Sequence, residues 1–138
     1  MTAYLIDTNV ISELTKPTPD VRVLKFLARE GDLWLSVVTL HELSYGVMRI
    51  AESGRRNRIA AWTESVKARF RGRLIFVDQA IAEAAGRARG HASLEGRAVA
   101  PLDALIGATA WTRSMILATR NVRHFEALDI SIFDPWSP

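Results

Sequence analysis

The chain has 138 residues, 49% hydrophobic and 24% charged, with a formal net charge of +3 and no cysteine; we expect one domain over residues 1–138. The lack of cysteine excludes disulfides and thiolate metal sites, and no apolar run approaches the roughly 20 residues of a membrane span. Since no secretory leader is recognisable, we expect a cytoplasmic protein that does not enter a membrane.

Five short apolar runs are predicted to be strands, and six longer segments with helical spacing lie among them. The strands lack alternation of apolar and polar residues, which indicates a parallel sheet buried on both faces. We therefore predict an α/β fold with three layers, α/β/α, and a central, mostly parallel sheet of about five strands. The expected strands are residues 4–7, 33–37, 73–77, 115–119 and 130–133, and the expected helices are 9–15, 20–30, 39–52, 57–71, 79–95 and 101–113.

Three polar residues stand where the first predicted strand ends: Asp7 is its last residue, and Thr8 and Asn9 follow it directly. A helix that starts here needs only one N-cap, so two of the three are surplus to capping. We expect Thr8 or Asn9 to be the cap. Open α/β sheets bind ligands beyond the carboxyl ends of their strands, so this joint is a candidate binding site.

Other polar residues follow later strands or begin helices. Glu42 follows the second strand by about one helical turn, Asp103 lies in the first turn of a helix that opens at Pro101, and Asn121 follows the fourth strand. Because carboxyl ends of parallel strands share one edge, Asp7, Glu42 and Asp103 are expected to converge there.

Each of these positions also has an ordinary structural explanation. Thr39 and Glu42 fit a capping box, Asp103 suits the positive end of a helix dipole, Asp7 could cap, and Asn121 could occupy a turn. Capping does not require ionised groups that gather at one edge, however, and like charges repel unless a cation lies between them. Convergence of the three carboxylates therefore favours a site for a divalent cation.

A basic stretch between residues 55 and 73 holds seven arginine or lysine side chains against one acid, Glu64. Arginine pairs well with phosphate oxygens, so the stretch could bind a nucleic-acid backbone. A solvated helix surface explains it equally well. Apolar residues in the segments 9–30 and 57–71 could also line a groove for a partner helix, although most are expected in the core.

Five blocks along the chain together resemble the PIN-domain family, and within it the VapC and FitB-like toxins of bacterial toxin–antitoxin pairs. The resemblance implies an endoribonuclease that depends on Mg²⁺ or Mn²⁺. It also implies a homodimer, and a VapB-like antitoxin that blocks the site in a toxin–antitoxin hetero-oligomer. The blocks are "YLIDTNVISEL", "LSVVTLHELSYGV", "APLDALIGATAW", "ILATRNVRHFEAL" and "IFDPW".

Roles for individual residues also come from this resemblance. Asp7, Glu42 and Asp103 match acidic metal-binding positions, Thr8 and Asn9 match polar residues that support Asp7, and Thr119 and Asn121 match the polar motif after the fourth strand. For the mechanism, we expect Asp7 and Asp103 to be direct ligands and Glu42 to orient or deprotonate the attacking water, because a carboxylate within hydrogen-bond reach serves as a general base. Separate from the resemblance, our candidates for RNA contact are Arg49, Arg120, Arg123 and His124.

One departure from the family pattern concerns the residues after the fourth strand. Family members usually carry an acid directly after "TR" or just before the following Phe, and this chain has Asn121 and His124 instead. The lost negative charge should weaken the affinity for a second metal ion, so we expect either one-metal operation or a strong dependence on bound substrate to hold a second ion. The alternative is a catalytically weakened PIN module that binds RNA or a partner without cleavage. A receiver-like signalling domain does not fit, because the central strands end at Ser36 and Thr119 instead of an aspartate.

Overall fold

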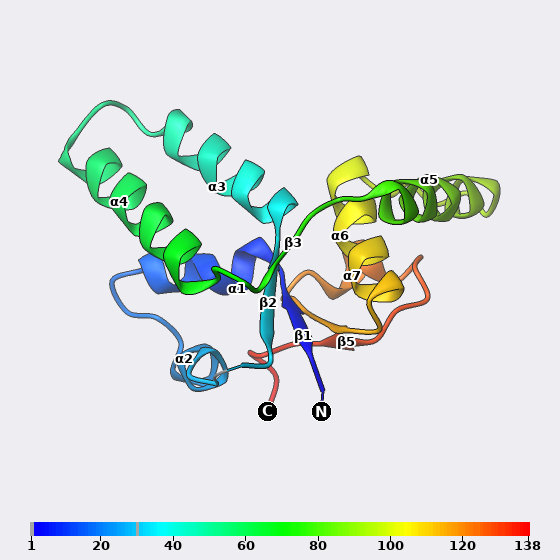
Figure 1. Ribbon diagram of the computed structural model, residues 1–138, viewed down its shortest axis with the longest axis horizontal. Coiled ribbons are helices and arrows are strands. Elements are labelled where there is room, and N and C mark those ends of the chain that lie inside the picture. Colours follow the sequence, from blue (N-terminus) through cyan, green and yellow to red (C-terminus); the bar gives the residue numbers. More distant parts are fainter. Residues whose placement is uncertain (1, 30) are drawn as a thin grey trace.

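The computed structural model describes residues 2–29 and 31–138, and Figure 1 shows their arrangement. Helices and strands alternate along most of the chain. The elements are β1 (Tyr4–Ile6), α1 (Thr8–Ser12), the 3-10 turn η1 (Glu13–Thr15), α2 (Val21–Leu27), β2 (Leu33–Ser36), α3 (Val37–Arg49), α4 (Gly54–Arg69), β3 (Leu74–Ile75), α5 (Gln79–Leu94), α6 (Pro101–Thr112), β4 (Ile116–Ala118), α7 (Val122–Phe125) and β5 (Ile132–Phe133).

The sheet has five parallel strands in the order β3-β2-β1-β4-β5. Tyr4 of β1 pairs with Leu33 of β2 on one side and with Ile116 of β4 on the other. The chain therefore places β2 and β3 on one side of β1, and then crosses to the other side to place β4 and β5. Ligands of open α/β sheets bind at such a reversal, which here is the carboxyl end of β1 and β4.

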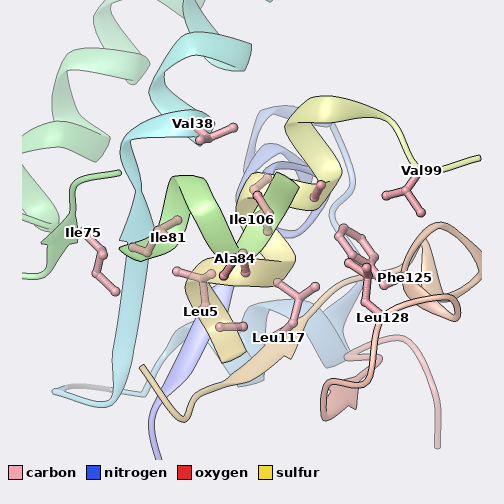
Figure 2. Packing of buried hydrophobic residues seen from close by; sticks show 14 of the residues in the cluster. Leu5, Val38, Ile75, Ile81, Ala84, Val99, Ile106, Leu117, Phe125 and Leu128 are labelled. Carbon is pink, nitrogen blue, oxygen red and sulfur yellow. The ribbon is translucent and has the colours of Figure 1, made fainter. Parts of the chain in front are cut away.

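Two hydrophobic clusters cover the two faces of the sheet, because successive residues of a strand point to opposite sides. Leu5 and Leu117 pack mainly under α5, α6 and α7, as Figure 2 shows. Ile6 and Ala118, the next residues along the same strands, pack under α1, α2, α3 and α4. All four are at most 1% exposed, which confirms the predicted three-layer fold.

The limits of several elements differ from the prediction. All five strands are present but shorter than expected, and α7 is a helix that the sequence did not predict. The segment predicted as a helix over 20–30 is helical from Val21 to Leu27, and residue 30 lies outside the described part of the chain. The helix expected from residue 39 begins at Val37, because the Ser36 hydroxyl accepts a hydrogen bond from Val38 N at 3.0 Å and caps it.

Two pairs of helices stand on either side of the carboxyl edge of β1 and β2 (Figure 1). The antiparallel pair α3 and α4 extends to one side, and α5 with α6 extends to the other. Within residues 2–29 and 31–138, no helix has the length and apolar character needed to cross a bilayer. The edge between the two pairs receives side chains from the joint between β1 and α1, from α3 and from α6.

Candidate active site

Asp7 occupies the joint between β1 and α1. Its backbone N–H donates to the Ala118 carbonyl at 2.9 Å, which continues the ladder between β1 and β4. Its backbone is extended, and its Oδ1 accepts a hydrogen bond from Thr8 N at 2.8 Å. Asp7 is therefore the N-cap of α1, and the prediction that Thr8 or Asn9 caps this helix is wrong. Because Asp7 provides the cap, the side chains of Thr8 and Asn9 are free for other contacts.

Thr119 and Asn9 hold the second oxygen of the Asp7 carboxylate. The Thr119 hydroxyl, which is fully buried, donates to Asp7 Oδ2 at 2.8 Å, and Asn9 Nδ2 donates to the same oxygen at 3.2 Å. Thr119 Oγ1 accepts the backbone N–H of Asn121 at 3.0 Å, and Asn9 Oδ1 accepts that of Arg120 at 3.2 Å. This network joins the ends of β1 and β4 and fixes the position of the carboxylate.

Glu42 lies in the second turn of α3 and reaches back to α1. Thr8 donates its hydroxyl to Glu42 Oε1 at 2.8 Å, and the hydroxyl oxygens of Thr8 and Thr39 are 3.2 Å apart. Because Ser36 caps α3, the capping box that Thr39 and Glu42 could have formed is absent from this helix. Helix capping therefore does not explain why a half-buried glutamate stands at position 42. The hydrogen bond from Thr8 directs the Glu42 side chain to the edge that carries Asp7.

Asp103 is the third residue of α6, after Pro101 at the start of the helix. Its Oδ2 lies 3.4 Å from Nδ1 of His124, so the two form an ion pair when the imidazole is protonated. His124 belongs to α7, and this short helix brings it to Asp103. Asp103, Arg123 and His124 line a hollow of about 480 Å³ beside the site.

The three carboxylates share one electrostatic environment. Burial raises the pKa of Asp7, hydrogen bonds from Thr119 and Thr8 lower it, and the charge of Asp103 raises it further. The pKa of Glu42 is raised by burial, lowered by the bond from Thr8, and raised by the charges of Asp7 and Asp103. Burial also raises the pKa of Asp103, and His124 partly offsets this.

The residues fit a divalent cation in their chemistry. Among residues 2–29 and 31–138, no three acidic or histidine side chains are arranged tightly enough to hold a metal ion together. Mg²⁺ nevertheless keeps several waters and takes only one or two protein carboxylates directly. Buried carboxylates that raise one another's pKa repel each other when ionised. A cation bound between them would relieve this repulsion.

Of the residues expected to contact RNA, Arg123 and His124 lie beside Asp103, and Arg49 and Arg120 lie elsewhere. Arg120 follows Thr119, but its guanidinium stacks 5.0 Å from the ring centre of Trp136. Arg49 lies at the end of α3, with its guanidinium 5.5 Å from the ring centre of Tyr45. Asn121 is exposed and contacts the site through its backbone N–H.

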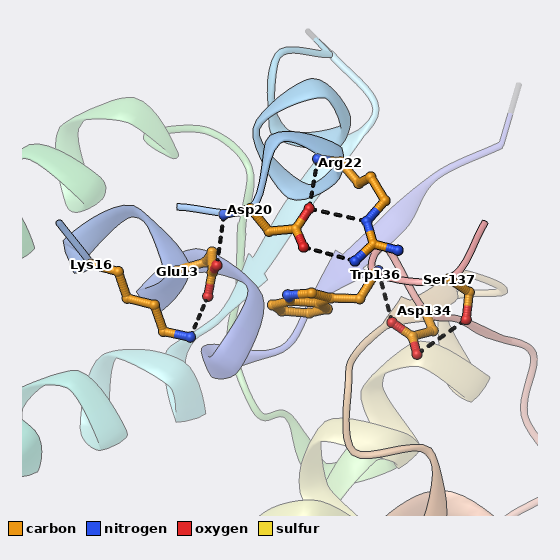
Figure 3. Close-up of polar contacts among 7 residues, drawn as sticks. All are labelled: Glu13, Lys16, Asp20, Arg22, Asp134, Trp136 and Ser137. Carbon is orange, nitrogen blue, oxygen red and sulfur yellow. Dashed lines mark hydrogen bonds and ion pairs between the residues drawn. The ribbon is translucent and has the colours of Figure 1, made fainter. Parts of the chain in front are cut away.

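A second polar cluster was missed by the sequence analysis. Glu13 is only 4% exposed, pairs with Lys16 at 2.8 Å and accepts the backbone N–H of Asp20 at 2.8 Å, as Figure 3 shows. Asp20 binds Arg22 through both carboxylate oxygens beside the Trp136 ring. The only sequence signal was an acid inside an apolar helical run. The cluster anchors the turn between η1 and α2.

These features define a class of protein. It is an all-parallel α/β protein that carries interacting carboxylates at the point where its strand order reverses. The PIN domain family matches residues 4–130, and the chain belongs to this family.

Individual relatives match almost the full chain. Toxin FitB from Neisseria gonorrhoeae is 36% identical over 135 residues, which cover 96% of this chain and 97% of that protein. VapC ribonuclease Y4jK from Sinorhizobium fredii is 32% identical and covers 97% of this chain and 98% of its own length.

Two solved structures have the same fold. The crystal structure of FitAcB from Neisseria gonorrhoeae contains a chain with a TM-score of 0.90 at 35% identity, covering 98% of this chain and 99% of that chain. The second is the crystal structure of VapBC-5 from Mycobacterium tuberculosis, a member of the VapBC family of toxin-antitoxin systems. One of its chains has a TM-score of 0.71 at 29% identity, and the match covers 96% of this chain and 97% of that chain.

Proposed function

We propose that the chain is a metal-dependent endoribonuclease and the toxin of a toxin–antitoxin pair, and that it hydrolyses RNA phosphodiesters at the Asp7 edge of the sheet. One observation carries the proposal: Asp7, Glu42 and Asp103 come from three separate elements, two of them are fixed by threonine hydroxyls, and their charges interact. The printed names of the relatives, a toxin and a ribonuclease, support it.

Asp7 and Asp103 would hold Mg²⁺ or Mn²⁺ directly, with Glu42 in contact through water. The oxygen-only donor set suits either ion. A bound divalent ion supplies positive charge to a phosphodiester oxygen and lowers the pKa of water, which makes hydrolysis possible near neutral pH.

The chain's own groups prepare the site for an incoming phosphodiester. Thr119 and Asn9 keep the Asp7 carboxylate in one orientation, so it need not reorganise when substrate arrives. Thr8 occupies Oε1 of Glu42, which leaves Oε2 to accept a proton from the attacking water. Burial raises the pKa of Glu42, which makes its carboxylate a stronger base. Arg123 and His124, beside Asp103, would receive a flanking phosphate.

A small VapB-like antitoxin is the proposed partner, and a homodimer bound to antitoxin is the proposed assembly. The likeness to a chain of a toxin–antitoxin system supports the first of these. The proposed substrate is cellular RNA, so we propose that the protein acts in the cytoplasm.

A second candidate function follows from Asn121 and His124. Family members usually carry an acid at one of these two positions, and the lost charge would favour a PIN module that binds RNA or a partner without cutting. One bound ion per chain, together with RNA cleavage that stops when this ion is removed by chelator, would separate a working one-metal enzyme from this alternative.

Cleavage of total RNA tests the proposal. The purified chain should cut RNA in Mg²⁺ or Mn²⁺ and stop in chelator. Asp7→Asn and Asp103→Asn should each lower the rate by about a hundredfold or more, the loss typical of removing a group that stabilises transition-state charge. The matched control is Asp78→Asn. Asp78 is the N-cap of α5 and pairs with Arg113, which lies at the end of α6 opposite to Asp103.

Thermal unfolding and circular dichroism would verify that every variant is folded. If Asp7→Asn and Asp103→Asn cut as fast as the parent, the proposed site is wrong. If the folded parent binds RNA but cuts none in either metal, the binding module is the better assignment. Growth arrest on expression, relieved by the product of a small neighbouring gene, would distinguish a toxin from a housekeeping nuclease.

A further inference from the structure

Helix α3 continues beyond the candidate active site and presents an exposed aromatic ring. Tyr45 is 59% exposed, although tyrosine usually buries much of its ring. Residues three and seven apart lie on one face of a helix, so Glu42, Tyr45 and Arg49 share a face. Tyr45 lies about 4.5 Å and Arg49 about 10.5 Å along the helix axis from Glu42.

Tyr45 and Arg49 line an open hollow where α3 turns into α4. This α3–α4 hollow has a volume of about 550 Å³ and is formed by residues 45–46, 49–51, 53 and 55. The Arg49 guanidinium lies 5.5 Å from the centre of the Tyr45 ring, which is cation–π distance. The helix pair that carries the hollow extends away from the sheet in Figure 1.

The surroundings of the α3–α4 hollow are strongly basic. Residues 43–63 contain four arginines and one acid, Glu52. Arg49 and Arg55 both line the hollow. A third arginine, Arg56, contacts the Met48 sulfur at 3.0 Å and joins the first turn of α4 to the last turn of α3. The combination of an exposed ring with guanidinium groups is what a nucleotide needs, since the ring stacks on a base and the guanidinium pairs with phosphate.

We propose that the α3–α4 hollow is a binding subsite for a nucleotide of single-stranded RNA. The base stacks on Tyr45, and Arg49 and Arg55 pair with its phosphates. This inference rests on the proposed function and deepens it, because the shared face of α3 leads the strand from the hollow to Glu42. The charge of the hollow favours a polyanion over an apolar helix of a protein partner.

Binding of two oligonucleotides in chelator tests the subsite without cleavage. One probe is a fluorescent 12-residue oligoadenylate, and the other is an abasic ribose-phosphate chain of the same length and charge. The parent should bind oligoadenylate more tightly. Tyr45→Ala should weaken oligoadenylate binding by about fivefold or more while abasic binding stays unchanged, because only the base contributes stacking. Tyr45→Trp should restore the preference.

Arg49→Gln separates the phosphate contact from the stacking contact. It should weaken both probes and lower the slope of log affinity against log salt by about 0.7, the value for one phosphate contact on a single strand. Trp111→Ala is the matched control, because Trp111 is 60% exposed and lies near the other end of α6 from Asp103. It should change neither probe.

Gly46→Leu keeps the test independent of folding. A Cβ at Gly46 would meet nothing within 4 Å and Gly46 lines the α3–α4 hollow, so we expect a leucine side chain there to project into the hollow without disturbing the helix. Replacing glycine inside a helix should raise thermal stability while oligoadenylate binding falls. A misfolded protein could not produce these opposite changes.

The outcomes distinguish this inference from the proposed function. Equal loss of both probes in Tyr45→Ala, or no loss of either, overturns the subsite even if the parent cleaves RNA. Loss of dimer or antitoxin binding in Tyr45→Ala with unchanged RNA binding also overturns it and assigns the surface to protein. A parent that neither cuts nor binds RNA instead overturns the proposed function.

Discussion

At the scale of single residues, the charge of Asp103 links the members of the site. It raises the pKa of both Asp7 and Glu42, although it sits on a different helix. Thr8 and Thr119 act in the opposite direction, because hydrogen bonds to a carboxylate favour its charged form. The site therefore holds Asp7 and Glu42 in place with neutral hydroxyls, and among the described residues His124 and His41 offset part of the negative charge of the three carboxylates.

Asp103→Asn tests this coupling without any metal. Removing the charge should lower the pKa of Asp7 and of Glu42 toward their ordinary values, because one repulsive neighbour is lost. The measurement is a carbon NMR titration of side-chain carboxyl groups in chelator. Asp129→Asn, on the exposed segment after α7, is the matched control. Unchanged titration of Asp7 and Glu42 in Asp103→Asn would show that Asp103 interacts with neither of them.

The same variant has a signed effect on stability. A carboxyl group with a raised pKa in the folded state binds more protons there than in the unfolded chain, so its stabilising contribution is lost as pH rises above the unfolded value. For Asp7 and Asp103 that value is 3.8, and for Glu42 it is 4.5. Unfolding in urea from pH 4 to 7 should therefore show Asp103→Asn gaining stability relative to the parent as pH rises. If Asp103→Asn instead lost stability relative to the parent as pH rises, the pKa of these carboxyl groups would be lowered, not raised, in the folded state.

At the scale of elements, close packing of α6 positions Asp103. Gly107 lies one turn after Asp103, and a Cβ there would lie 2.5 Å from Leu128 Cδ1 and 3.7 Å from Phe125 Cδ1. The glycine thus lets α6 approach α7 and the segment that follows it. This approach brings His124 of α7 to Asp103.

Gly107→Ala should therefore disturb both stability and the site. Overpacking typically costs about 1–3 kcal/mol, and the better helix propensity of alanine recovers less than about 1. The measurement is the free energy of unfolding together with cleavage rate. Gly86→Ala, where a Cβ meets nothing within 4 Å, should instead stabilise by roughly 0.5–1 kcal/mol. The nearest atom is the terminal methyl of Leu128, so the cost depends on how far this side chain can move. In a Leu128→Ala background, whose own loss of stability is measured separately, Gly107→Ala should cost less than in the parent, and an equal cost in both backgrounds would contradict the contact between them.

The sequence predicted elements best where their signal was local. Strands such as Leu33–Ser36 stood out because they are buried on both faces, so their apolar runs are continuous. The start of α3 was missed because Val37 and Val38 follow β2 without a turn, and β-branched residues favour strands. Helix α7 has only four residues, too few to show a helical period.

Site residues were predictable as far as they follow strand ends. Asp7 could be named because it lies where a strand that the sequence reveals comes to its end, whereas Thr119 was named only through the resemblance to the PIN-domain family. The partner of each side chain could not, because contacts such as Thr8 with Glu42 depend on how α1 and α3 pack. Tyr45 was missed for a similar reason: its exposure results from the extension of α3 away from the sheet.

At the scale of the whole molecule, the strand order explains why Asp7 and Thr119 meet. The chain reverses direction of growth at β1, so β1 and β4 are neighbours although Asp7 and Thr119 are 112 residues apart in sequence. The net charge of the chain is +3, yet the carboxylates gather at this one edge. A cation there would offset a local repulsion that the basic surroundings do not remove.

Mg²⁺ should consequently stabilise the folded chain, and more so as pH rises. Ligands that bind only the folded state raise its stability with concentration. Protons compete for carboxylates whose pKa is raised, so the rise in melting temperature caused by millimolar Mg²⁺ should be larger at pH 7 than at pH 5. The doubly substituted Asp7→Asn, Asp103→Asn chain should show no rise, and NaCl of equal ionic strength controls for screening. A pH-independent rise that survives in this variant would mean that Mg²⁺ binds elsewhere.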